Sequence, residues 1–356
     1  MNALVDRYVE DGIWNMNSPR ETCRVPTEPL TITQAEEYEL NRLALSVWKA
    51  QESVIDMTMY GTQQPWVRLN RLQSIYPDGL TMPPAIRVDT VLSEDGLRII
   101  EVDPVSAISL GETISLIRIW QEQGYQIPDG LLETISGLVA KGTGELSLEL
   151  PSEKSQYQAE VGYLAKMLAR EGVIIDERAP LKLSSFPEVP ANRRFINGQG
   201  WSEPTNPLWG SLSDFSDKTN LELLMCGDKQ AFASYLPRIY QRDELNELDP
   251  DATIVVKPIK GMGSVGVRAM TVNKALEFTG GYIFQEKVDP RVDSFTDDQN
   301  MQPTTYSSRV SIYAGKYGLL GAQVTARPRQ PTFTNVHGQA DAVQTTLAIS
   351  QKKEEL

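Results

Sequence analysis

The stretch IRVDTVLSEDGLRIIEVDP, residues 86–104, decides the fold. Two runs of alternating apolar residues flank a Ser-Glu-Asp-Gly turn, and an Asp-Gly pair between such runs is a strong signal for a β-hairpin. The two strands carry one arginine and three carboxylates, namely Arg87, Asp89, Glu101 and Asp103. Arg87 and Asp89 are two residues apart in the first strand, and Glu101 and Asp103 are two residues apart in the second. Side chains two residues apart in a strand point to the same face. The sequence therefore predicts a compact acidic cluster with an arginine at its edge.

Such a cluster has the chemistry of a magnesium site. Mg²⁺ is bound by oxygen atoms, and it usually takes one or two protein carboxylates and fills its other positions with water and substrate phosphate. We therefore expect Asp89, Glu101 and Asp103 to bind Mg²⁺ against a polyphosphate, with Arg87 as a fixed cation beside them. The alternative is an ordinary hairpin whose charged side chains face water.

A glycine-rich segment follows in the second half of the chain, ATIVVKPIKGMGSVGVRAM, residues 252–270. A β-branched run ends at Lys257, and a second strand comes after a loop that contains Gly261, Gly263, Ser264 and Gly266. Glycines let backbone N–H groups approach phosphate oxygens closely, and a lysine supplies a point charge. The loop is neither a Walker A loop nor a dinucleotide fingerprint, because the glycine spacing and the following strand differ from both. It is either a flap over phosphates or a plain hairpin turn.

Two further segments could contact a nucleotide. An apolar strand in residues 281–290 runs into Gln285 and Glu286, which could offer a backbone and a carboxylate to an adenine edge. Amphipathic strand ends look the same. Lys229, after Gly-Asp, could reach a phosphate or could be solvated, which is the usual state of a single lysine.

In this order the segments resemble the circularly permuted ATP-grasp ligases, most closely the glutathionylspermidine synthase-like group. In that group an Arg-x-Asp strand, a turn and a Glu-x-Asn strand bind the magnesium ions and the transferred phosphate. The counterparts here lie in 87–89 and 101–103. The group's Asn-Lys pair, Val-Lys-Pro-Ile strand end and Gln-Glu strand end resemble 228–229, 256–259 and 284–286. The acidic hairpin precedes the nucleotide lysines, as the permuted order requires.

The resemblance implies an ADP-forming carboxylate–amine ligase that uses ATP and Mg²⁺ and forms an amide or peptide bond through an acyl phosphate. Its substrates would be a small-molecule or peptide carboxylate and an amine. Arg87 and Arg309 would be catalytic, with Arg327 a further candidate. The resemblance assigns ATP binding to Lys229, Lys257, Gly261, Gly263, Ser264, Gly266, Gln285 and Glu286. An ATP-dependent small-molecule kinase and a non-catalytic nucleotide-binding protein are the alternatives.

The sequence also departs from that group. Asp103 replaces the usual asparagine and adds a negative charge. Residues 104–107 lack the group's Asp-Thr-Pro run, and the loop after Ile259 lacks its Arg-Glu pair. Both differences lie where substrate and phosphate would be handled, so ligase chemistry carries over better than glutathione or spermidine as substrates.

The net charge and the lengths of the apolar runs limit which classes of partner we expect. The chain has 356 residues and a net charge of −13, which argues against nucleic acid because its recognition needs a basic surface. No apolar run is long enough to span a bilayer, and Asp6, Glu10 and Asp11 interrupt the region where a signal peptide has its apolar core. We expect a cytoplasmic protein whose partners include neither nucleic acid nor membrane. The sequence does not indicate its oligomeric state.

The expected fold class is α/β (α+β), an ATP-grasp fold in circularly permuted order with a helical N-terminal region and a small open α/β sheet domain. The expected parts are the helical region at 1–80, the metal-binding hairpin and helix at 81–150, the small α/β domain at 151–215, the nucleotide-binding part at 216–350 and a tail at 351–356.

Two local patterns predict further elements. Thr33 and Glu36 form a capping-box pattern, and a packed helix face is predicted by residues at helical spacing, namely Leu43, Val47, Ala50 and Val54. A second hairpin is predicted from the run at 309–313 and the strand at 319–327.

Overall fold

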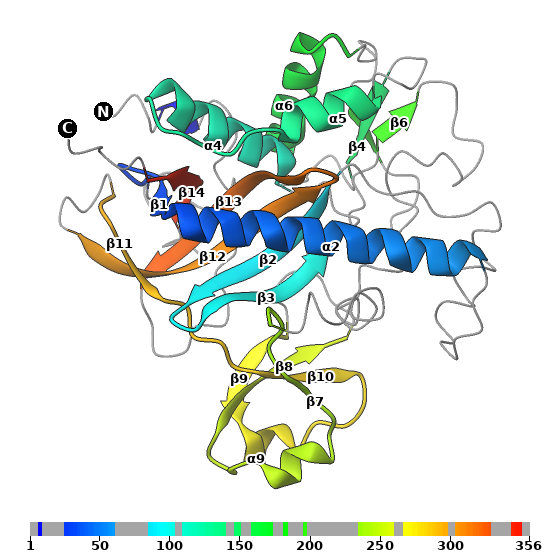
Figure 1. Ribbon diagram of the computed structural model, residues 1–356, viewed down its shortest axis with the longest axis vertical. Helices are drawn as coiled ribbons and strands as arrows, with labels where there is room; N and C mark the ends of the chain where they lie inside the picture. Colours follow the sequence, from blue (N-terminus) through cyan, green and yellow to red (C-terminus); the bar gives the residue numbers. More distant parts are fainter. Residues whose placement is uncertain are drawn as a thin grey trace.

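The structure is a computed structural model of the chain. It describes residues 6–8, 25–60, 85–103, 109–139, 146–150, 158–173, 181–183, 195–197, 234–259, 266–297, 303–328 and 343–350. The described part is a mixed α/β fold in which helices lie on both sides of a central sheet, with a smaller sheet below it (Figure 1).

Two hairpins build most of the central six-stranded sheet. β2 (Ile86–Ser93) pairs with β3 (Gly96–Asp103), and β12 (Thr304–Gly315) pairs with β13 (Gly318–Pro328). Both hairpins are therefore confirmed. β2 and β12 pair antiparallel, which joins segments more than 200 residues apart. The sheet runs in the order β14-β13-β12-β2-β3, with β14 (Val343–Thr345) and β3 at its two edges. β11 (Val292–Phe295) lies off this order and pairs with β12.

The turns of both hairpins depend on glycine. Gly96 and Gly318 adopt φ angles of +105° and +121°, in a region that residues with a side chain rarely enter. The Ser93 hydroxyl also donates to the Gly96 carbonyl at 2.7 Å, which fixes the first turn. The Asp-Gly signal in the sequence therefore identified the turn correctly.

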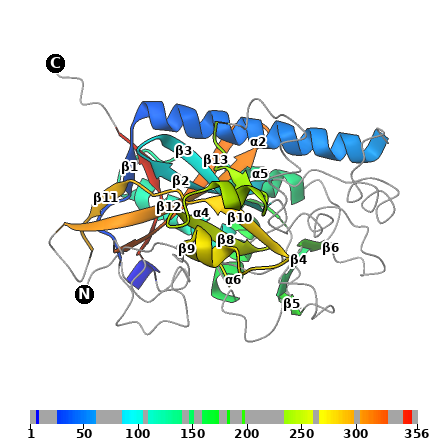
Figure 2. The same ribbon diagram turned by 90° about the horizontal axis from the view of Figure 1, so that it is seen from below.

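One face of this sheet is covered by α2 (Gln34–Tyr60) (Figure 2). The predicted capping box is present: the Thr33 backbone N–H donates to the Glu36 carboxylate at 2.7 Å, and the Glu36 N–H donates to the Thr33 hydroxyl at 3.2 Å. Leu43, Val47 and Ala50 are fully buried, as the helical spacing predicted, and the side chain of Val54 lies outside the described residues. The burial of this face, rather than helix propensity, fixes α2 on the sheet.

The other face of the sheet is covered by α4 (Leu110–Glu122) and α5 (Leu131–Val139), and α6 (Gln158–Arg170) packs on α4. Gly111 in the first turn of α4 lies against the backbone of Glu160 in α6. A Cβ added at Gly111 would lie 2.1 Å from the Glu160 carbonyl oxygen. The close crossing of these two helices therefore requires a glycine.

We predict that Gly111→Ala destabilises the protein by about 1–3 kcal/mol, because the new methyl group forces two helix backbones apart. The matched control is Gly162→Ala in α6, where an added Cβ meets nothing within 4 Å. That control gains about 1 kcal/mol from helix propensity. Urea unfolding of both variants checks the prediction, and equal midpoints for the two would contradict it.

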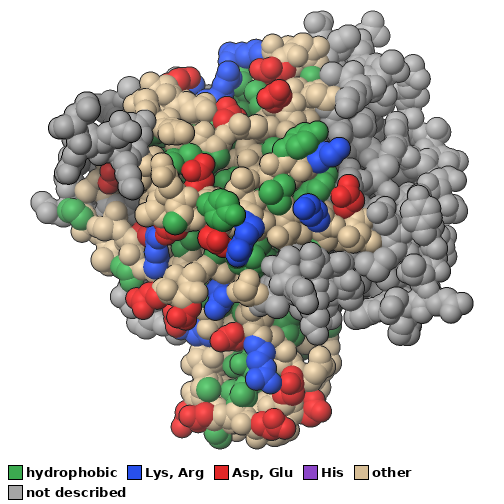
Figure 3. Space-filling model, viewed as in Figure 1, with side chains coloured by type: hydrophobic (Ala, Val, Ile, Leu, Met, Phe, Trp, Pro, Cys, Tyr) green, Lys and Arg blue, Asp and Glu red, His purple; other side chains and the backbone are tan. Residues whose placement is uncertain are grey.

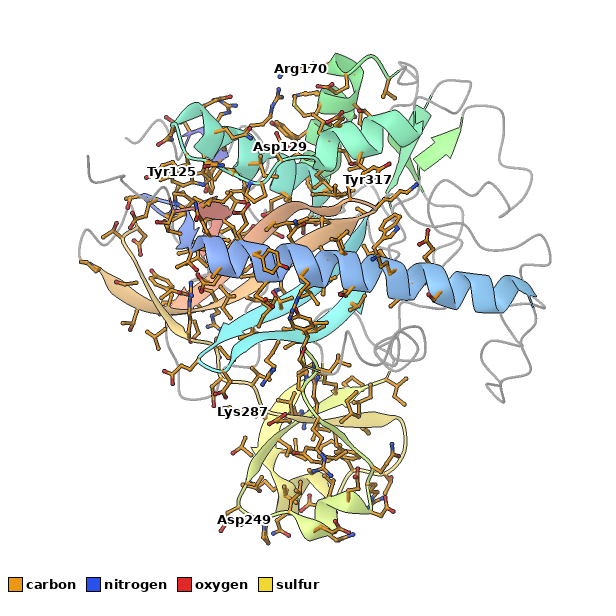
Figure 4. The ribbon with its side chains drawn as sticks, viewed as in Figure 1. Tyr125, Asp129, Arg170, Asp249, Lys287 and Tyr317 are labelled. Atoms are coloured by element: carbon orange, nitrogen blue, oxygen red, sulfur yellow. The ribbon has the colours of Figure 1, made fainter. Side chains whose placement is uncertain are left out.

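A smaller four-stranded sheet lies at the bottom of Figure 1, in the order β7-β10-β8-β9. Its strands are β7 (Ile239–Tyr240), β8 (Thr253–Pro258), β9 (Arg268–Thr271) and β10 (Tyr282–Glu286). A 3₁₀ helix at Glu244–Glu247 and α9 (Val272–Ala275) pack on one of its faces around a separate hydrophobic cluster. We call the described residues between 236 and 290 the lower unit. In Figure 4, Lys287 lies where this unit meets the central sheet and Asp249 lies at its far end.

Short strands complete the described part. β1 (Leu30–Ile32) pairs in parallel with β15 (Leu347–Ile349). A three-stranded sheet contains β4 (Leu146–Leu150), β5 (Leu181–Leu183) and β6 (Phe195–Asn197). Among the described helices, none has the length and apolar character needed to cross a membrane. On the face seen in Figure 3, acidic and basic side chains are interspersed, and acidic groups gather at the far end of the lower unit.

Candidate nucleotide and metal site

The hairpin of β2 and β3 brings the predicted arginine and carboxylates together. Arg87 pairs with Asp103, and Asp89 pairs with Glu101. Residues directly opposite each other in an antiparallel pair point to the same face. All four side chains therefore lie on one face of the sheet, the face opposite α2.

A β-bulge makes this arrangement possible. Thr90 lies opposite Ile99, but the next pair is Asp89 with Glu101, so Ile100 is an extra residue in β3. Without the bulge Asp89 would lie opposite Ile100. Glu101 would then point to the opposite face from Asp89, because a shift of one residue exchanges the two faces of a strand. The bulge is therefore the backbone feature that forms the acidic cluster.

Asp89 is the centre of the cluster and is only 2% exposed. The Arg87 guanidinium donates to both of its carboxylate oxygens, with Nε 3.1 Å from Oδ1 and Nη2 3.4 Å from Oδ2. Arg309 of β12 adds a second ion pair, with Nη1 3.4 Å from Asp89 Oδ2. Arg309 is thus a buried member of the cluster rather than a surface residue at a strand end.

Arg87 keeps its positive charge in this setting. Burial lowers the pKa of its guanidinium, but the charges of Asp89 and Asp103 raise it, and the pKa ends above the ordinary arginine value. The side chain is 13% exposed. A permanent cation therefore lies among the carboxylates and close to solvent.

Tyr313 lies on the same face as the acidic cluster, and the sequence did not indicate it. It lies opposite Arg87 on β12, is 1% exposed and forms a side-chain hydrogen bond with Thr113 in the first turn of α4. Burial raises the pKa of the Tyr313 phenol well above its usual range, although the charge of Arg87 and the hydrogen bond with Thr113 act in the other direction. Tyr313 is therefore a neutral link between α4 and the cluster. The signal that could have found it is its place on the same strand face as Arg309.

Lys257 connects the lower unit to the cluster. Its ammonium group donates to the Ile100 carbonyl at 2.9 Å. Ile100 is the extra residue of the bulge, and it directly precedes Glu101. The lysine at the end of β8 therefore reaches the backbone that positions the acidic cluster, over a sequence separation of 157 residues.

The remaining described candidates lie nearby in the lower unit. Gln285 is 3% exposed and pairs with Ile239 and Val255, while Ile283 pairs with Lys257. The Glu286 N–H donates to the Arg238 carbonyl at 2.8 Å, and the Glu286 carboxylate accepts from the Arg238 N–H at 3.0 Å. Two hydrogen bonds therefore join Glu286, at the end of β10, to Arg238, near the start of the lower unit.

Part of the predicted phosphate loop is described. Gly266 adopts a φ of +78°, and a Cβ added there would lie 3.1 Å from the Pro258 ring. Gly266 therefore lies against the Lys257-Pro258 strand end. The other predicted nucleotide residues, Lys229, Gly261, Gly263 and Ser264, lie outside the described residues.

Two anchors that the sequence did not reveal fix the lower unit to the central sheet. The Ile99 N–H donates to the Tyr235 carbonyl at 2.8 Å, and the Tyr235 hydroxyl accepts from Arg42 Nε at 2.7 Å. At the other end, the Arg291 N–H donates to the Leu92 carbonyl at 2.7 Å, and its guanidinium pairs with Glu36. Both ends of the lower unit are therefore bound to the first hairpin and to α2.

Within the described ranges, no group of three or more His, Cys, Asp or Glu side chains is arranged to hold a metal ion. A site here would therefore have to combine one or two carboxylates with oxygen atoms from another source.

Comparison with solved structures shows that similar folds are known. No protein-family profile matches the chain, and no curated protein matches it. The structure is similar to that of a glutathione synthetase-like effector from Globodera pallida in its apo form, with a TM-score of 0.59 and 13% identity. The similarity covers 98% of this chain and 97% of that one. At this identity the similarity concerns the fold alone.

A second solved structure is more distant. It is a protein of Methylobacillus flagellatus named provisionally as a gamma-glutamylcysteine synthetase, with a TM-score of 0.44 and 10% identity over 91% of this chain and 89% of that one.

Proposed function

We propose that this protein is an ATP- and Mg²⁺-dependent carboxylate–amine ligase that releases ADP and forms an amide or peptide bond through an acyl phosphate. We further propose that its fold is an ATP-grasp fold in circularly permuted order. The observation that carries the proposal is the bulged register of β2 and β3. It gathers Arg87 and three carboxylates on one face, where Arg309 pairs with Asp89, and Lys257 binds the backbone carbonyl of the bulge residue Ile100.

The donor set fits Mg²⁺. Carboxylates are hard oxygen ligands, and Mg²⁺ needs only one or two of them when phosphate oxygens supply others. Asp89 and Glu101 lie directly opposite each other, and Asp103 follows on the same face. We assign metal binding to these three residues, with one or two of them contacting any one ion and phosphate oxygens completing its ligands. The ion would offset negative charge on the phosphates during transfer.

ATP would lie between the lower unit and the acidic face of the hairpin. Lys257 and Gly266 would contact its phosphates, and Gln285 and Glu286 would lie on its adenine side. We assign the same nucleotide-binding role to Lys229, Gly261, Gly263 and Ser264. The supporting observation is that Lys257 and Gln285 both lie on the face of the lower unit opposite its hydrophobic cluster.

The reaction needs positioning and charge stabilisation rather than a protein nucleophile. A carboxylate oxygen of the substrate would attack the γ-phosphorus, and the bond from that phosphorus to the β–γ bridging oxygen would break to release ADP. Arg87 and Arg309 would stabilise the negative charge on the transferred group. An amine would then attack the acyl carbon, and inorganic phosphate would leave.

Hydroxylamine provides the test, because as the amine it converts an acyl phosphate to a hydroxamate. The protein would be incubated with ATP, Mg²⁺, hydroxylamine and, in turn, acetate, succinate, glycine and L-glutamate. We expect ADP and a hydroxamate in equal amounts with at least one acid. ADP with a stable phosphorylated product and no hydroxamate would favour the kinase, and nucleotide binding without ADP release would favour the non-catalytic protein. Either result would overturn the ligase proposal.

We predict that Lys257→Met weakens ATP binding about 10- to 100-fold, because a charge-assisted hydrogen bond to phosphate is lost while the aliphatic part of the side chain is kept. The control is Lys274→Met, which removes an exposed lysine of α9 in the same unit. Isothermal titration calorimetry with ATP and Mg²⁺ measures both. The same ATP affinity in both variants would contradict the role of Lys257.

A further inference from the structure

A polar patch on β12 and β13 adjoins Asp89 and consists of Arg309, Ser311, Gln323 and Thr325. Ser311 pairs with Asp89 on one side and with Gln323 on the other, and Arg309 pairs with Thr325. Paired residues share a face, so this patch lies on the same face as the acidic cluster. Ser311, Gln323 and Thr325 are each 1% exposed. The sheet therefore buries a group of polar side chains next to the proposed reaction centre.

Two hydroxyl groups of this patch lack a hydrogen-bond partner among the described residues. In the part of the chain that the structure describes, neither Ser311 Oγ nor Thr325 Oγ1 has a hydrogen-bond partner. Most buried polar atoms in proteins are hydrogen-bonded to protein or to ordered water, so an exception needs an explanation. The amide of the adjoining Gln323 is engaged elsewhere, since its Nε2 donates to Gln344 Oε1 at 2.9 Å.

The chemistry of the patch favours an anionic acceptor. Each hydroxyl can donate one hydrogen bond, and Arg309 at the edge of the patch adds a guanidinium. A carboxylate accepts several hydrogen bonds at once and pairs well with a guanidinium. A cationic amine would instead be repelled by Arg309. The two hydroxyls and the arginine therefore match a carboxylate better than an amine.

We propose that Ser311, Thr325 and Arg309 bind the carboxylate group of the acid substrate and so determine specificity for the acid. This rests on the proposed ligase function, because the carboxylate would then lie beside Asp89 and Arg87, where the phosphoryl group is transferred. Ser311 and Thr325 act by binding and take no part in bond making.

The sheet provides matched controls for this proposal. Ser308 and Thr345 also carry buried hydroxyls without a partner among the described residues, but they lie on the opposite face, towards α2. Ser308→Ala and Thr345→Val therefore remove the same groups from the same sheet without touching the patch.

The test uses ¹³C-labelled acetate as the probe, titrated against wild type, Ser311→Ala, Thr325→Val, the double variant and the two controls, with binding followed by NMR line broadening. We expect the dissociation constant of acetate to rise about tenfold in each single variant and further in the double variant. The controls should match wild type. Retained urea midpoints would establish that all variants fold.

Equal acetate affinity in the patch variants and the controls would overturn the proposal, as would a wild type that does not bind acetate. Thermal shift with ATP and Mg²⁺ on the same samples separates this failure from that of the ligase function. An intact nucleotide shift with unaffected acetate binding refutes the patch alone. A wild type without any nucleotide shift refutes the ligase function itself.

Discussion

Asp89→Asn is expected to lower the free energy of unfolding by about 3–5 kcal/mol, because removing one partner of a buried ion pair leaves uncompensated charge. Asp89 is the shared anion of Arg87 and Arg309, so the variant leaves two mostly buried guanidinium groups without the carboxylate that both contact. The loss should exceed that of an ordinary surface ion pair, which contributes about 0–1 kcal/mol. Urea unfolding followed by circular dichroism measures it.

The matched control is Asp95→Asn, in the exposed turn of the same hairpin. It removes the same charge from the same two strands, and its stability should stay within about 0.5 kcal/mol of wild type. If the Asp89 variant were as stable as this control, Asp89 would not be the centre of a buried ion-pair cluster.

Arg87→Ala is expected to lower turnover about 10²- to 10³-fold while the affinity for ATP changes little, since a group that stabilises charge on the transferred phosphoryl acts in the transition state. Arg87 fits this role because it stays charged in the cluster and remains partly exposed. Turnover is measured as hydroxamate formation, and ATP affinity by titration calorimetry.

Two variants sharpen this test. Arg87→Lys keeps a charge but loses the two-point contact with Asp89, so it should recover only part of the activity. Lys316→Ala removes an exposed cation from the β12–β13 turn and should behave as wild type. Equal loss of turnover and ATP affinity in Arg87→Ala would show that the arginine serves binding rather than catalysis.

Local patterns in the sequence were sufficient to predict the β2–β3 hairpin, which carries the acidic cluster, and the helix α2, which packs on the sheet. Alternation and the Asp-Gly turn predicted the β2–β3 hairpin, and the Thr33–Glu36 pattern predicted the start of α2. These predictions succeed because hydrogen bonds and turn conformations within a few residues depend on nearby side chains alone. The alternation of side chains between the two faces of a strand also predicted that Arg87 and Asp89 share a face, and that Glu101 and Asp103 share a face.

The contacts between distant segments could not be predicted in this way, although Arg309 and Lys257 were themselves candidates. Nothing near Arg309 in the sequence indicates that it meets Asp89, and nothing near Lys257 points to the Ile100 carbonyl. Tyr235 and Arg291, which anchor the lower unit, likewise gave no signal. Each of these contacts joins segments that are far apart in the sequence. They become neighbours because packing of the hydrophobic core between α2 and the sheet determines which strands pair.

The sequence by itself determined the chemistry available to this protein: an arginine and three carboxylates on two strands, and a lysine before a glycine loop. The tertiary structure decided whether those groups could meet. An unbulged hairpin would have placed Asp89 and Glu101 on opposite faces, and the extra residue Ile100 places them on the same face. The physical reason is that the side-chain period fixes faces within one strand, whereas register between strands is set by the packing of the whole sheet.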